Sequence, residues 1–225
     1  MIILKDEPRK KIDKQIPLEV RRYLGELTIE AYRTSKLLME NTPALQFPRA
    51  RKLLLPELKN IMLEFMIIQA VKNNKLPFNY RINFNSNHSH PYLELYNDDI
   101  LIHFNQVRTK SSCARKAIFR DKILSSVQTE FVFDEEVSSD DLFSDKTYYQ
   151  FNHGYQTETP QFITLGIPNN MYEFEVSVPI LEEYAAIEGR YPTSTKEELH
   201  DDFDDKLFEK IQQYAEGKIE DERAK

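Results

Sequence analysis

The sequence predicts an α+β protein with N-terminal helices, a central mostly antiparallel sheet of about six strands, and C-terminal helices. Apolar residues recur every three or four positions before residue 72, alternate with polar ones from residue 80 to 178, and return to helical spacing near the C-terminus. Elements grouped in this way indicate α+β, whereas doubly wound and barrel folds need alternating strands and helices. We expect a helical region over 1–76 packed on a region over 77–225.

The N-terminal part is expected to hold two helices after a loose, charged arm over residues 1–15. Val20, Leu24, Leu27, Ala31 and Leu38 share one face of a helix over 17–40. The sequence Asn-Thr-Pro at 41–43 should end this helix, because the residue before proline avoids the helical region. A turn should carry Arg49, Arg51 and Lys52, and Pro56 should start a helix that is apolar on most faces over 58–71 and therefore buried.

The hairpin over residues 92–107 allows two registers around Asn97-Asp98-Asp99. With Asp98-Asp99 as the two-residue loop, Glu94 lies opposite His103. A shift by one residue instead places Tyr92 opposite His103. A further strand is expected over 80–84, and a loop over 108–116.

The C-terminal half should hold strands over 148–152, 162–167 and 172–178, after an acidic loop over 134–146. Gly154 is expected to supply a turn between the first two of these strands. Helices are predicted over 179–188 and 194–216, the second with a capping box at Ser194.

Composition restricts the setting of the protein. A single cysteine, Cys113, excludes an internal disulfide and suits a reducing compartment. The most apolar stretch, 61–71, is far shorter than the about 20 residues of a membrane-spanning helix. The N-terminal apolar run is too short for a signal peptide. We therefore expect a cytoplasmic protein without a membrane partner.

Charge is distributed unevenly along the chain. Residues 1–122 hold 22 Lys and Arg against 13 Asp and Glu, and residues 123–225 hold 8 against 24, so the halves carry +9 and −16. Such asymmetry indicates an electrostatic role. Three alternatives remain for the acidic half: it solubilises the chain, it docks a basic protein partner, or it pairs with the basic half of another copy in a homo-oligomer.

The basic residues suggest a phosphate-binding or nucleic-acid-binding face. Cations of the 108–122 segment meet only one acid, Asp121, and Ser111 and Ser112 add hydroxyl groups. With the N-terminal cations they would form one positive surface; otherwise the segment is a solvated loop balanced by the acidic half. The candidate residues are Arg49, Arg51, Arg108, Lys110, Arg115, Lys116 and Arg120.

Histidines suggest two kinds of chemistry. His88 and His90, with His103 or Glu94, have a spacing that would suit a metal, although loop histidines are more often polar turn residues. Alternatively, His103 with Arg108, Arg115, Lys116 and Tyr155 has the residue types of a metal-independent ribonuclease site, with His103 as the base. No strand carries the Asp…Glu-x-Lys spacing of common metal nucleases, and we expect no cofactor. Cations beside Cys113 would lower its pKa.

The leading interpretation is a non-enzymatic binding or regulatory protein. It would act through protein contacts and a local basic nucleic-acid face, and a bacterial or phage defence or toxin–antitoxin component is a compatible setting. The alternative is a small metal-independent nuclease that uses His103 and the basic 108–122 segment.

Overall fold

The structure is a computed structural model and describes residues 8–85, 88–126, 146–154 and 157–183. All of these belong to a compact unit formed by residues 1–189. Apart from residues 180–183, which begin a helix as expected, the predicted C-terminal helices lie outside the described residues, as does the acidic loop over 134–146 except for Lys146.

Helices α1 (Pro8–Gln15), α2 (Leu18–Asn41) and α3 (Pro48–Lys72) form the N-terminal part, with a 3₁₀ turn, η1 (Pro43–Leu45), between α2 and α3. The helix predicted over 17–40 is confirmed as α2. A loose arm up to residue 15 was wrong, because residues 8–15 are helical. Ile12 is the only buried residue of α1, so the sequence shows too little apolar periodicity to reveal it.

Helix α3 begins earlier than expected. Pro48 occupies its first turn, a position where the missing N–H is harmless, and Pro56 lies inside the helix. The predicted turn at Arg49, Arg51 and Lys52 was therefore wrong, since these residues belong to α3. The expected burial is correct only on one side: Leu63 and Ile67 are buried, whereas Ile61 is 52% exposed.

Six strands form one sheet in the order β1-β2-β3-β4-β5-β6. Their bounds are Asn79–Phe84, Pro91–Tyr96, Ile100–Val107, Thr147–Gly154, Ile163–Pro168 and Phe174–Pro179, with α4 (Ile118–Ser126) between β3 and β4. All neighbours are antiparallel except β3 and β4, which are parallel. The sheet is therefore mixed and mostly antiparallel, as predicted. Gly154 lies within β4 and not in the expected turn.

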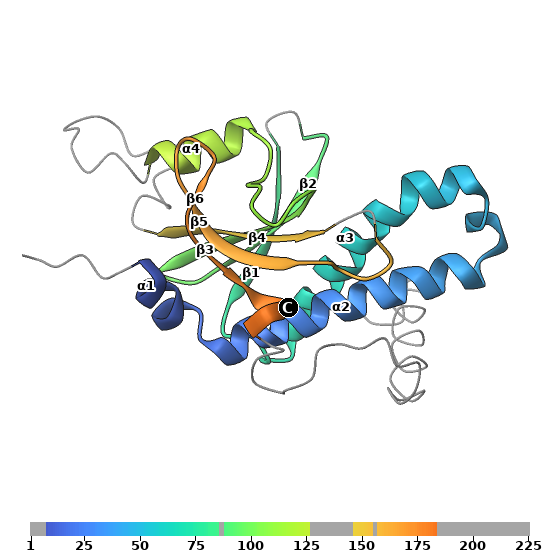
Figure 1. The fold of residues 1–225 in the computed structure, drawn as a ribbon, viewed down its shortest axis with the longest axis horizontal. Coiled ribbons are helices and arrows are strands. Elements are labelled where there is room, and N and C mark those ends of the chain that lie inside the picture. Colours follow the sequence, from blue (N-terminus) through green and yellow to red (C-terminus); the bar gives the residue numbers. More distant parts are fainter. Residues whose placement is uncertain (1–7, 86–87, 127–145, 155–156, 184–225) are drawn as a thin grey trace, which may run out of the picture. The chain divides into compact units, whose positions relative to one another are not determined.

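Helices cover both faces of the sheet (Figure 1). Alternate residues of a strand point to opposite faces. On one face, Tyr149 of β4 donates a hydrogen bond to Gln15 of α1 and His153 bonds to Tyr32 of α2. On the other face, Tyr148 packs with Leu124 of α4. The sheet is thus the middle of three layers, with α1, α2 and α3 on one side and α4 on the other.

Candidate binding cleft between α3 and α4

A cleft opens where the central sheet divides. β1 and β2 pair along six residues, and β3 and β4 along eight. In contrast, β2 and β3 pair at only three positions, the first joining Glu94 with His103 and the last joining Tyr96 with Leu101. Beyond Glu94 and His103 a cleft of about 620 Å³ has Pro91 and Tyr92 on the β2 side and Phe104, Asn105 and Gln106 on the β3 side.

Helix α3 forms hydrogen bonds with both strands that border the cleft, β2 and β3. The Gln106 amide of β3 donates a 2.6 Å hydrogen bond to the carbonyl of Pro56. On the other lip, the backbone N–H of Leu93 in β2 bonds to the carboxyl of Glu64. Each lip therefore has a polar contact with the same helix, which forms the floor and one wall of the cleft.

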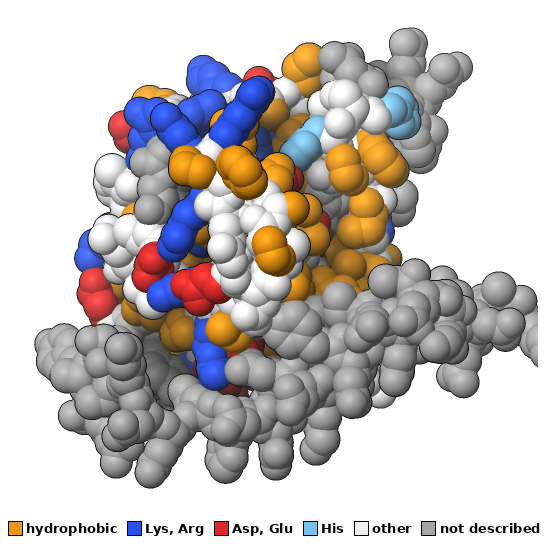
Figure 2. All heavy atoms as spheres, turned by 90° about the vertical axis from the view of Figure 1, so that its right-hand side faces the viewer, with side chains coloured by type: hydrophobic (Ala, Val, Ile, Leu, Met, Phe, Trp, Pro, Cys, Tyr) orange, Lys and Arg blue, Asp and Glu red, His pale blue; other side chains and the backbone are white. Residues whose placement is uncertain are grey.

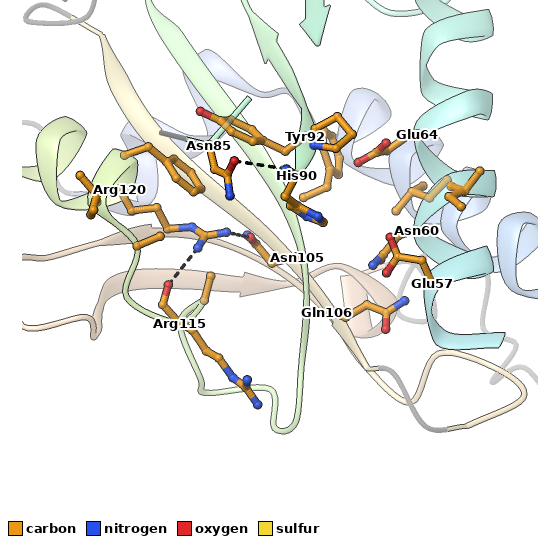
Figure 3. A pocket seen from close by; sticks show the side chains of 18 residues that line it. Glu57, Asn60, Glu64, Asn85, His90, Tyr92, Asn105, Gln106, Arg115 and Arg120 are labelled. Atoms are coloured by element: carbon orange, nitrogen blue, oxygen red, sulfur yellow. Dashed lines mark hydrogen bonds between the residues drawn. The ribbon is translucent and has the colours of Figure 1, made fainter. Parts of the chain in front are cut away.

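The α3 wall is acidic. Glu57, Asn60 and Glu64 follow one another at three- and four-residue spacing, so they share one face of the helix and line the cleft (Figure 3). Burial, and to a smaller extent the charge of Glu57, raises the pKa of Glu64 to about 7 against the hydrogen bond from Leu93, which lowers it. The charge on this wall therefore changes near neutral pH.

The opposite wall carries a fixed cation. Arg120 of α4 donates hydrogen bonds to Asn105 Oδ1 at 2.6 Å and to the Arg115 carbonyl at 2.9 Å, and its guanidinium lies 4.6 Å from the Phe119 ring centroid (Figure 3). Within the described part of the chain no carboxylate forms an ion pair with it, and its buried Nε–H has no partner. Neutral acceptors therefore hold this positive charge, with no ion pair to it among the described residues.

Apolar side chains complete the cleft. Ile61 of α3 is 52% exposed and Ile118 at the start of α4 is 63% exposed. Tyr92 and Phe119 stack with ring centroids 4.4 Å apart. Exposed apolar side chains inside a recess with a few polar groups are typical of ligand-binding pockets.

A buried polar chain lies beneath this aromatic pair. His103 Nε2 is 2.9 Å from Glu94 Oε1, and His103 Nδ1 is 3.1 Å from the Tyr148 hydroxyl. Arg81 donates to the second oxygen of Glu94. Burial would raise the pKa of Glu94, but His103 and Arg81 hold it below its usual value. Burial lowers the pKa of His103 despite Glu94, so the ring is neutral and donates from Nε2.

This geometry leaves His103 without access to a substrate. Its ring is buried, with both nitrogens bonded, and it does not line the cleft. Of the two hairpin registers that the sequence allows, the structure has the one with Glu94 opposite His103, because Asn97 Oδ1 accepts the Asp99 and Ile100 N–H groups and so makes Asp98-Asp99 the loop. Tyr155, another candidate of the nuclease hypothesis, lies outside the described residues.

The candidate cations do not all surround the cleft. Arg115 and Arg120 line it. Arg51 pairs with Glu158 and Lys110 with Glu182, while Lys116 lies over the Tyr172 ring. Arg49 is exposed on the first turn of α3, and Arg108 follows the end of β3. The phosphate-binding hypothesis therefore narrows to two of its seven residues.

Figure 2 shows where charge gathers on one face of the molecule. Lys and Arg side chains collect at its upper left, next to apolar side chains. The loop after β3 and helix α4 bring six cations and one acid to this part of the chain, namely Arg108, Lys110, Arg115, Lys116, Arg120 and Lys122 with Asp121. This segment is therefore basic although the whole chain is acidic.

The remaining candidates are the loop histidines and the single cysteine. Among the described residues, no three His, Cys, Asp or Glu side chains are placed to hold a metal ion. His90 lines the cleft, whereas His88 lies beside Phe84. Burial, and then the charge of Glu173, raises the pKa of Cys113 to about 11, so the expectation that cations lower it was wrong.

Sequence reasoning missed the acidic wall. Glu57, Asn60 and Glu64 are polar residues in a mostly apolar helix. Their spacing places them on one face, and this pattern could have predicted a polar surface there. Tyr92 and Asn105 lie on strands whose separation no local pattern reveals.

None of the helices that the structure describes has the length and apolarity needed to cross a bilayer. Compared with known proteins, the chain matches no protein-family model, no curated protein and no solved structure.

Proposed function

We propose that the protein binds nucleic acid through the cleft between α3 and α4. The observation that carries this proposal is the guanidinium of Arg120, which neutral partners hold in the cleft without a carboxylate partner in the described part of the chain. A bound phosphate would supply the missing negative charge and an acceptor for the remaining N–H groups.

Arg115 extends the cationic surface beyond the cleft. Its side chain lies at the edge of the cleft and points away from Arg120 (Figure 3). The two guanidinium groups would therefore contact different phosphates of one strand. The acidic wall of α3 repels phosphate and would keep the backbone on the α4 side. Binding is therefore local to this wall, consistent with an acidic chain that is a poor general polyanion binder.

Charge reversal tests this proposal. We expect Arg115→Glu to weaken binding of labelled oligonucleotides by more than about tenfold at low salt, and to flatten the salt dependence by about one unit of slope. Lys75→Glu, an exposed cation outside the cleft, is the matched control. Fluorescence anisotropy across a salt series measures both effects. Equal losses in the two variants would remove the cleft from nucleic-acid binding.

A protein contact is the second candidate function. Phe47, Leu53 and Leu54 are 69%, 59% and 47% exposed, and all three lie at the N-terminal end of α3. Large apolar side chains gathered in one place are typical of an interaction surface. A second copy of the chain is the partner that the charge asymmetry favours.

Sizing by light scattering tests the self-association. We expect a mass above one chain that falls to one chain in Phe47→Asp/Leu53→Asp, because charged side chains would be buried in the contact. Met171→Asp, at a 79% exposed position outside α3, is the control. A mass of one chain at both low and high ionic strength would exclude this contact.

A further inference from the structure

We infer that the cleft receives a single unstacked nucleotide, so that the protein prefers single-stranded nucleic acid to a duplex. This inference rests on the proposed nucleic-acid binding and specifies its substrate class. It depends on the size of the cleft, on the apolar side chains that two opposite walls present, and on the separation of positive and negative groups.

The cleft has the dimensions of a small-ligand site. Its volume of about 620 Å³ falls within the range of pockets that enclose small organic molecules and cofactors. A duplex keeps its bases stacked inside and its phosphates outside, so it would touch only the rim. A nucleotide that has left the stack can enter with its base first.

Two exposed isoleucines face the interior from different elements. Ile61 belongs to α3 and Ile118 to α4, and both line the cleft although more than half of each side chain is exposed. Phe104 adds a third apolar surface from β3. A nucleobase has two apolar faces, and burial of these faces against apolar side chains would remove both surfaces from water.

The polar groups set the direction of the nucleotide. Arg120 and Arg115 lie on the α4 side, whereas Glu57, Asn60 and Glu64 lie on the α3 side (Figure 3). A phosphate is attracted to the first set and repelled by the carboxylates of the second. The base edge carries N–H donors that carboxylate and amide oxygens accept, so it belongs against α3.

The experiment compares a labelled single strand with a hairpin duplex of the same bases, in DNA and in RNA, by fluorescence anisotropy. We expect the single strand to bind at least about tenfold more tightly, because only it can lose water from a base at the cleft. Ile61→Ala/Ile118→Ala should weaken single-strand binding at least about tenfold, because each truncation removes three carbons that a bound base would cover. It should leave duplex binding unchanged.

Met171→Ala is the matched control, because it truncates an exposed apolar side chain outside the cleft. Equal binding of strand and duplex, or a double variant that binds like Met171→Ala, would overturn the inference while nucleic-acid binding through Arg115 stands. If no oligonucleotide binds in a manner that depends on Arg115, the proposed function fails and the inference fails with it. Thermal melting checks that the exposed substitutions leave the fold intact.

Discussion

Glu64 lies partly buried on the cleft wall, and its pKa of about 7 brings its ionisation into the physiological range. The ordinary value is 4.5, so between about pH 4.5 and 7 the folded chain holds a proton that the unfolded chain releases. The free energy of unfolding consequently decreases as pH rises through this window. At 1.36 kcal/mol per pH unit, the full cost above pH 7 is on the order of 3 kcal/mol at most.

Replacement of this carboxyl should remove the pH dependence that it causes. Glu64→Gln keeps an oxygen to accept the Leu93 N–H, and we expect it to be more stable than the parent at pH 8 by about 1–3 kcal/mol, with a smaller difference at pH 5. Urea unfolding at the two pH values measures this. Glu175→Gln, exposed on β6, controls for the loss of one negative charge. A constant difference between Glu64→Gln and the parent at both pH values would contradict the shifted pKa.

His103 shows what could and could not be predicted for a single residue. The sequence limited its cross-strand partner to Glu94 or Tyr92, because strand alternation and the loop length determine which side chains face each other, and the structure has Glu94. Its burial could not be predicted, because the residues that contact the ring are distant in sequence: Phe119 lies on α4 within the long β3–β4 connection, and Tyr148 lies on β4 after it. The residue types suggested catalysis, whereas their arrangement makes His103 part of the core.

At the level of elements, the glycine of β5 controls how β5 and β6 pair. A Cβ on Gly166 would lie 2.5 Å from the Phe174 ring and 2.9 Å from the Val176 carbonyl oxygen, and the oxygen belongs to the backbone of the paired strand. The register also shifts at Ile167–Pro168, next to this contact. The sequence gives β5 the small residue that this close approach requires.

We expect Gly166→Ala to lower the free energy of unfolding by about 1–3 kcal/mol, because the added methyl group must displace a ring and a strand. Chemical denaturation measures the change. The double variant Gly166→Ala/Phe174→Ala removes the ring but not the carbonyl, and should recover only part of the loss. Unchanged stability in the single variant would show that β6 moves freely.

Elements with strong periodicity were predictable, and elements with few apolar residues were not. Helix α2 and the strands β1, β2 and β3 follow the expected patterns closely. Helix α1 had too weak an apolar pattern to be predicted, because one isoleucine, Ile12, provides its buried surface. Its other contacts are ion pairs, of Asp13 with Arg21 in α2 and of Arg9 with Glu183, which no local pattern indicates. The sequence predicted a helix start at Pro56, whereas Pro56 lies inside α3.

At the level of the whole molecule, the fold class follows from the order of the elements, but the cleft does not. Helices before and after a run of strands indicated α+β correctly. The cleft arises because β2 and β3 separate after three residue pairs and α3 bonds to both lips. No local pattern encodes where two paired strands diverge, since the cause lies in the packing of a helix against both.

The charge asymmetry indicated a basic segment, but it could not show which of its cations lie at the cleft. Cations of the 108–122 segment do reach the cleft through Arg115 and Arg120, as one predicted positive face would require. Arg51 and Lys110 instead meet acids of the second half, Glu158 and Glu182. Counting charges along a chain reveals an imbalance, but only the folded arrangement shows which charges neutralise one another.

The division of the sheet also links occupancy to heat resistance. The β1–β2 hairpin and the β3–β4 pair are joined by only three residue pairs between β2 and β3. This junction therefore has fewer backbone hydrogen bonds than the longer strand pairs on either side of it. A molecule bound against Tyr92 of β2 and Asn105 of β3 would contact both strands of this junction. Because it binds only the folded chain, it would raise the melting temperature in proportion to the logarithm of its concentration.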